Sequence, residues 1–216
     1  MTSKALKEFL VPRRDRPLLE AAMSSGEVVA DIAMRDELLS AVPVVGTVFK
    51  VLKAFDSVRD AFIERRLRLF VETIDEIPKS QRDRMRQRFE DDPEASHAAS
   101  VLMLVLDKLN DLDKAPLLGF LLQCYAREEI DTATFKRLAV AVDLAFPDDL
   151  RDFVKGPHVS YSYPPGAPEP DFRARLLVAG LTRVSNGVTW NSDSGIIHPA
   201  TELGEVFRKL TQIHAA

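Results

Sequence analysis

The stretch from Val101 to Ala126, VLMLVLDKLNDLDKAPLLGFLLQCYA, decides the fold of this chain. Two apolar runs, at 101–106 and 117–126, flank the short polar segment NDLDK. A helix that is apolar on every side is expected to be buried on every side. A short connection makes consecutive helices antiparallel neighbours. We therefore predict that a helix ending near Leu109 packs directly against a helix over Ala115–Ala126, at the centre of a helical body.

Apolar residues recur at spacings of three and four on both sides of this hairpin, which predicts further amphipathic helices. The longest run spans 48–77 and ends before Pro78, and a second helix is expected over 80–90. Asp92 followed by Pro93 predicts the start of the helix that leads to Leu109, and Asp131 predicts the start of another that Pro147 stops. Nearer the N-terminus, shorter helices are expected from Asp15 onward.

A proline-rich segment separates this body from a different kind of tail. KGPHVSYSYPPGAPEP at 155–170 holds five prolines and predicts an extended linker. The sequence of the tail predicts three elements in order. They are a helix over Asp171–Ala179 ended by Gly180, a hairpin with its turn at Asn186-Gly187, and a last helix capped by Thr201. The predicted fold is mainly α: an all-helical body over 1–154, a linker over 155–170 and a helix–β-hairpin–helix element over 171–216.

Composition limits the classes of function. The 216 residues carry 29 Lys+Arg against 33 Asp+Glu, a net charge of −4, which is a poor overall match for a polyanion. The single cysteine excludes an intrachain disulfide and favours a cytoplasmic location. No signal peptide and no membrane-spanning helix are expected, because the apolar window at 38–55 is interrupted by Pro43, Gly46 and two lysines.

The sequence offers no recognisable catalytic or metal-binding spacing. Its histidines lie far apart, and each is expected to be a solitary surface residue: His97, His158, His198 and His214. Cys124 lies in the apolar run and is expected to be a core residue rather than a nucleophile. The acidic hairpin residues Asp107, Asp111 and Asp113 lack the glycine and glutamate of a calcium loop. We therefore expect no enzyme activity, no cofactor and no metal.

The tail resembles the second half of a winged-helix domain. The matching residues are Ala179-Gly180-Leu181, the Asn186-Gly187 turn, and Thr201-Glu202-Leu203-Gly204. Over its full length the chain is similar to uncharacterised bacterial helical proteins with this kind of tail, some of them suspected of belonging to stress or phage-defence loci. The stretches VPVVGTVFK and DKLNDLDKA carry that similarity, which implies no particular activity.

Three hypotheses of function follow. The leading one is a non-enzymatic scaffold or accessory protein that binds a protein partner, including a second copy of itself, through aromatic and wing residues: Tyr161, Tyr163, Asn186 and Trp190. The second is a nucleic-acid-binding regulator that uses the tail and the basic segment Lys79–Arg88. Its contacts would be Arg82, Arg84, Arg86, Arg88, Arg173, Arg175 and Arg183. The third is a membrane-active effector that uses Val42–Phe55.

Overall fold

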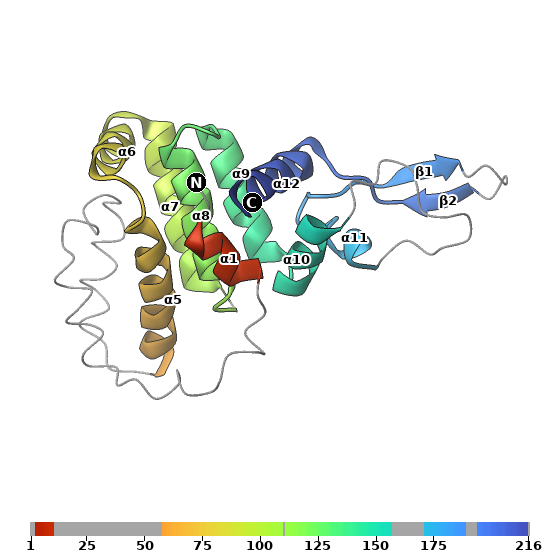
Figure 1. Ribbon diagram of the computed structural model, residues 1–216, viewed down its shortest axis with the longest axis horizontal. Helices are drawn as coiled ribbons and strands as arrows, with labels where there is room; N and C mark the ends of the chain where they lie inside the picture. Colours follow the sequence, from red (N-terminus) through yellow and green to blue (C-terminus); the bar gives the residue numbers. More distant parts are fainter. Residues whose placement is uncertain (1–2, 11–57, 110, 157–170, 189–193, 216) are drawn as a thin grey trace.

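A computed structural model describes residues 3–10, 58–109, 111–156, 171–188 and 194–215 (Figure 1). Most of the described residues are helical, as predicted. The helices are α1 (Lys4–Leu10), α5 (Val58–Ile74), α6 (Lys79–Asp91), α7 (Pro93–Lys108), α8 (Lys114–Ala126), α9 (Thr132–Leu144), α10 (Pro147–Lys155), α11 (Asp171–Arg175) and α12 (Glu202–Ala215). Two short strands, β1 (Ser185–Val188) and β2 (Ser194–Ile197), lie between α11 and α12.

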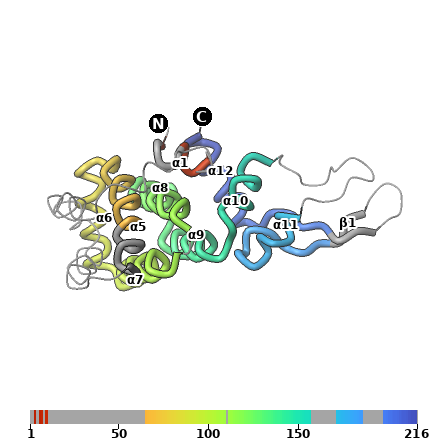
Figure 2. The backbone as a smooth tube through the Cα atoms, turned by 90° about the horizontal axis from the view of Figure 1, so that it is seen from below, coloured from red at the N-terminus to blue at the C-terminus, as the bar shows by residue number. Residues whose placement is uncertain are grey.

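Helix α8 is the centre of the fold, and every one of its residues is buried. It packs against α1, α5 and α9, and Figure 2 shows it between α5 and α9. The prediction that the preceding helix is buried on every side was wrong, since Leu104 of α7 is 58% exposed. The predicted direct pairing of α7 with α8 was wrong as well. The main neighbours of α7 are α9 and α6, and it makes a smaller contact with α5.

Local capping fixes the helix boundaries, and the predicted caps are confirmed. The Asp92 carboxylate accepts a hydrogen bond from the Glu94 amide at 2.8 Å, with Pro93 as the first residue of α7. The Asp131 carboxylate accepts one from the Thr134 amide at 2.7 Å at the start of α9. Pro147 separates α9 from α10 because it is the first residue of α10. The first N–H groups of a helix have no partner within the helix, so the N–H that proline lacks is not missed there. The expected helix over 48–77 is described only from Val58.

Helix α1 lies within the body predicted to be all-helical, but no separate helix was predicted there. Four of its seven residues are apolar, at Ala5, Leu6, Phe9 and Leu10, yet so short a helix depends on tertiary packing. Leu6 and Phe9 supply that packing: both are buried, and α1 lies against α8 and α12. The short helices expected from Asp15 onward lie outside the described residues.

In the tail, α11, the antiparallel strands β1 and β2, and α12 follow one another, and the predicted position of the hairpin turn was wrong. Asn186 and Gly187 do not form the turn: they lie inside β1 and pair with Ile196 and Gly195 in an antiparallel ladder. The residues between the two strands, 189–193, lie outside the described part of the chain. The predicted helix over Asp171–Ala179 is shorter than expected: α11 ends at Arg175, and Gly180, with a φ of +70°, ends the turn that follows it. The Thr201 hydroxyl accepts a bond from the Gly204 amide at 3.1 Å, as predicted for a cap.

The tail packs onto the helical body through α11 and α12. Helix α11 contacts α10, and α12 contacts α1, α9 and α10. Leu176, Leu203 and Phe207 belong to the same cluster of buried apolar residues as the core of α8. The hairpin, in contrast, extends away from the helices (Figure 1). The described parts of body and tail thus share one core, and the two ends of the described chain lie side by side in α1 and α12.

Candidate functional site

Most residues of the predicted interaction surface fall outside the described ranges. Tyr161 and Tyr163 lie in the linker and Trp190 lies between the strands, in segments the structure does not describe. Asn186 is placed only as a backbone position in β1. The proposal that these residues contact a partner stays a prediction.

The arginines of α6 are spread around the helix and several are engaged by the body. The Arg82 guanidinium donates to the Ile77 carbonyl at 2.7 Å, and the Arg88 guanidinium lies 4.6 Å from the centre of the Tyr125 ring. Arg86 approaches Asp83 at 3.9 Å, and Arg84 is exposed. These contacts hold α6 against its surroundings. The arginine side chains of α6 therefore do not line up as a single basic stripe.

The tail arginines also do structural work. Arg173 is only 2% exposed and donates to the His198 carbonyl at 3.4 Å, so the prediction that it contacts nucleic acid is contradicted by its burial. Arg175 donates to Asp149 of α10 at 2.8 Å, and this hydrogen bond raises the pKa of the guanidinium. Arg183 is exposed. Two of the three tail arginines therefore hold the tail together or fix it to the body.

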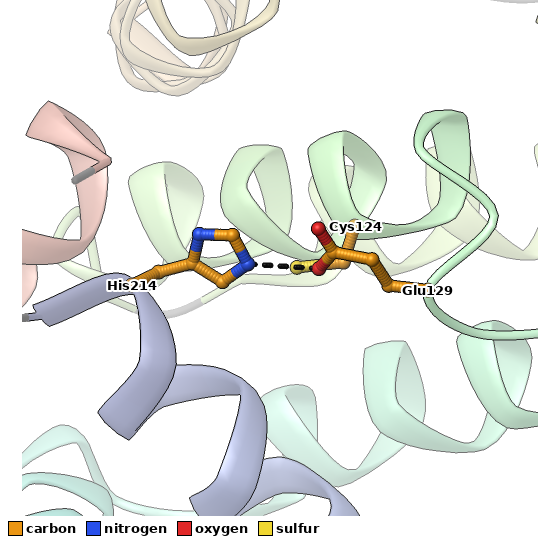
Figure 3. A group of neighbouring side chains, drawn as sticks. All are labelled: Cys124, Glu129 and His214. Atoms are coloured by element: carbon orange, nitrogen blue, oxygen red, sulfur yellow. Dashed lines mark hydrogen bonds and ion pairs between the residues drawn. The ribbon is translucent and has the colours of Figure 1, made fainter. Parts of the chain in front are cut away.

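The described residues bring one thiol, one carboxylate and one imidazole together beside α8. Cys124 lies on α8, Glu129 follows the end of that helix, and His214 lies in the last turn of α12 (Figure 3). Their sulfur, oxygen and nitrogen atoms all lie within 4.8 Å of one another, and His214 Nε2 is 2.8 Å from a Glu129 carboxylate oxygen. The expectation of a solitary surface histidine was wrong for His214, which is 5% exposed.

A tight chain reversal places Glu129 beside Cys124. The Glu129 amide donates to the Cys124 carbonyl at 3.0 Å, which folds the chain back over the end of α8. Glu128, which directly precedes Glu129, has a φ of +61°, the one positive value at a non-glycine residue in the described ranges. That conformation is unfavourable for a side chain with a Cβ and is often retained at functional sites.

The contacts around the other two side chains hold them in place. The His214 ring meets the Phe120 ring edge-on at 5.5 Å between centres, and the His214 carbonyl accepts from the Ser3 amide at 3.2 Å. Burial raises the pKa of the Cys124 thiol far above its usual range, and the nearby Glu129 carboxylate raises it further. The thiol is therefore neutral at pH 7, as the sequence prediction of an unreactive core cysteine requires.

Sequence spacing could not have revealed this cluster. Cys124 and Glu129 are five residues apart across a helix end, and His214 is 85 residues beyond Glu129. The folding of α12 back onto the body creates the cluster. Sulfur, imidazole nitrogen and carboxylate oxygen are the donor types that bind zinc in proteins.

A second feature is an exposed apolar surface on α7 and α9. The α7–α9 apolar face consists of large side chains of α7, of α9 and of the residue before α10 that are between 41% and 65% exposed: Leu104, Val140, Leu144 and Phe146. Single exposed apolar residues need no explanation, and the placement of these four toward the ends of two helices in contact makes them a candidate contact surface.

Comparisons with protein-family models, with curated proteins and with solved structures each return no match. The resemblance to bacterial defence proteins and the cytoplasmic location stay predictions. Among the described residues, none of the helices combines the length and the apolar content that crossing a bilayer requires.

Proposed function

We propose that this protein is a non-enzymatic scaffold or accessory protein that acts by protein–protein contact, and that a second copy of the chain occupies its α7–α9 apolar face. The observation that carries the proposal is the exposure of four large apolar side chains on α7, on α9 and directly after α9. Burying such side chains is the main driving force of association, at about 25 cal/mol per Å² of apolar surface before the costs of binding.

The arrangement of the two helices groups these side chains. Lys136 in the first half of α9 pairs with Glu94 in the first turn of α7 at 3.1 Å. At the other end, Lys114 follows α7 after a short loop and donates to the Asp143 carbonyl near the end of α9 at 2.7 Å. Helices α7 and α9 therefore run in the same direction, and their exposed apolar residues gather toward the same end.

Charges at the two ends of the face favour a second copy as its occupant. Exposed Arg137 precedes the face on α9, and exposed Asp107 follows Leu104 on α7. A twofold axis through the face exchanges its ends, which brings Arg137 of one copy toward Asp107 of the other. Such self-complementarity is what an isologous dimer requires.

The tail supports the same kind of function. Its helices pack on α10, Arg173 is buried and Arg175 is paired with Asp149, all of which favour a packing or partner-binding role for a winged-helix-like tail over nucleic-acid binding. The projecting hairpin (Figure 1) then offers a second surface for a protein partner.

Sedimentation velocity of the full chain over a range of concentrations tests the proposed dimer. We expect the wild type to dimerise, and Leu144→Asp and Phe146→Asp to weaken the dimer by roughly tenfold or more, because each places a charge in an apolar contact. Val178→Asp introduces the same charge at an exposed apolar residue of the tail, outside the α7–α9 apolar face, and serves as the matched control.

A charge exchange tests the orientation of the two copies. Arg137→Glu is expected to weaken the dimer, and the addition of Asp107→Arg to restore it. A wild type that stays monomeric at its highest soluble concentration, or an equal effect of Val178→Asp, contradicts the proposal.

A further inference from the structure

We propose that Cys124, Glu129 and His214 bind one zinc ion, which joins the end of α8 to the last turn of α12. The three side chains come from separate parts of the chain and converge on one point (Figure 3). One sulfur, one nitrogen and one oxygen ligand leave the fourth position of a tetrahedral ion for water.

The spacing of the donor atoms fits such an ion after small movements. Zinc–ligand bonds of about 2.0–2.3 Å place tetrahedral ligands roughly 3.3–3.7 Å apart. The donor atoms already lie within 4.8 Å of one another. His214 and Glu129, now 2.8 Å apart, have to separate slightly, and the Cys124 sulfur has to approach them. Side-chain rotations achieve shifts of this size without a change in the helices.

The charges of the three ligands balance those of the ion. When zinc binds, the Cys124 S–H bond breaks, a Zn–S bond forms and the proton passes to solvent. The resulting thiolate and the Glu129 carboxylate together carry two negative charges, which cancel those of Zn²⁺ beside the neutral His214 ring. Neutrality matters because Cys124 and His214 are buried, and an uncompensated charge there is costly.

Access and selectivity follow from the same geometry. The Glu129 side chain is 30% exposed, so an ion and its remaining water reach the cluster from that side. A thiolate and an imidazole favour zinc over magnesium and calcium, which prefer oxygen ligands. The left-handed backbone at Glu128 belongs to the reversal that ends α8, which brings Glu129 back beside Cys124.

Bound zinc would fix the C-terminal helix to the body. Helix α12 meets the cluster through His214, beside Ser3 and α1, so one ion closes the junction where both ends of the described chain meet α8. Zinc binding does not depend on the proposed dimer, because none of the three ligands belongs to the α7–α9 apolar face. A failure of either proposal leaves the other standing.

Metal content and cobalt spectroscopy of the untagged full chain test the site. We expect one equivalent of zinc per chain after dialysis against zinc, and no retention of magnesium or calcium. Cobalt in place of zinc should give the near-ultraviolet charge-transfer absorption of a thiolate ligand, which zinc then displaces. This readout on the wild type stands even if a variant does not fold.

Variants identify the ligands. Cys124→Ser, Glu129→Gln and His214→Gln are each expected to weaken zinc binding by more than tenfold. Loss of a group that only hydrogen-bonds to a ligand already weakens metal binding by about tenfold or more, and loss of a ligand itself should cost at least as much. His97→Gln alters an exposed histidine of α7 and is the matched control. Substoichiometric zinc, cobalt absorption without a thiolate band, or an equal loss in His97→Gln overturns the proposal and leaves a hydrogen-bonded network only.

Discussion

At the scale of single residues, Asp131 shows how one side chain sets a helix boundary. Its carboxylate accepts hydrogen bonds from the side chain and the backbone amide of Thr134, and these bonds lower the pKa of the carboxyl group. A lowered pKa means that the ionised carboxylate is more stable in the folded protein than in the unfolded chain. The cap therefore stabilises the protein above the ordinary Asp pKa, and this contribution is lost as the pH falls through the lower folded value.

We expect Asp131→Ala to lower the free energy of unfolding by about 1 kcal/mol at pH 7, the usual value of an N-cap. The difference in stability from the wild type should shrink at a pH below about 3.9, where Asp131 of the unfolded chain takes up a proton that the capped carboxylate of the folded protein still resists. Urea unfolding at the two pH values measures this. Asp131→Asn keeps a cap that does not titrate and should show little pH dependence, and a constant loss for Asp131→Ala at both pH values would contradict the assignment.

Residue-level features were predictable where the interaction is local. The caps at Asp92, Asp131 and Thr201 involve partners two or three residues away, so the sequence contains the whole interaction. The contact of His214 with Glu129 spans 85 residues and exists only because α12 folds back on α8. The local sequence therefore predicts the caps, and it cannot predict the contact of His214 with Glu129, which depends on the packing of distant segments.

At the scale of helices, Gly119 lets α5 and α8 approach closely. A Cβ built on Gly119 would lie 2.5 Å from the Cβ of Thr73, closer than real Cβ contacts come. The neighbouring atom belongs to the rigid base of a β-branched side chain, whose hydroxyl also donates to the Leu69 carbonyl at 2.9 Å. The helices would have to separate to admit a methyl group.

Gly119→Ala is expected to destabilise the fold by about 1–3 kcal/mol, as overpacking of a core usually does. The sign of this change in the free energy of unfolding is informative. Where no close contact opposes it, replacing glycine by alanine within a helix stabilises the protein by about 1 kcal/mol. Ser100→Ala, on the exposed side of α7, is a control that adds no atoms to the core. Thermal unfolding of the three chains measures the effect, and a stabilised Gly119→Ala variant would rule out the close contact.

Element types were predicted better than element neighbours. Apolar periodicity and caps locate α6, α7, α8 and α9, because each helix carries its own pattern. The sequence did not show that α8 rather than α7 is enclosed, since both runs are apolar and only the packing of α1, α5 and α9 distinguishes them. Asn186-Gly187 misplaced the turn because the local preference of that pair yields to the register of the ladder.

At the scale of the whole molecule, Arg151 joins parts of the chain that are distant in sequence. Its buried guanidinium donates to the Phe9 carbonyl of α1 at 2.7 Å and to Asp148 at 2.7 Å, and it also pairs with Asp113 at the start of α8. The same group lies 4.9 Å from the centre of the Phe9 ring. One side chain of α10 therefore links the N-terminal helix to the central helix.

Arg151→Met keeps most of the apolar stem and removes the charge, so it isolates the polar links. We expect a loss of about 3 kcal/mol in the free energy of unfolding, because Asp113 and the Phe9 carbonyl lose a buried partner. Arg68→Met breaks the exposed pair with Glu72 and should cost only about 0.5 kcal/mol. If urea unfolding gave the two variants equal losses, the buried guanidinium would contribute no more than a surface pair. The attachment of α1 to the body would then rest on the apolar contacts of Leu6 and the Phe9 ring and on the hydrogen bonds of Ser3 with Gln123 and His214.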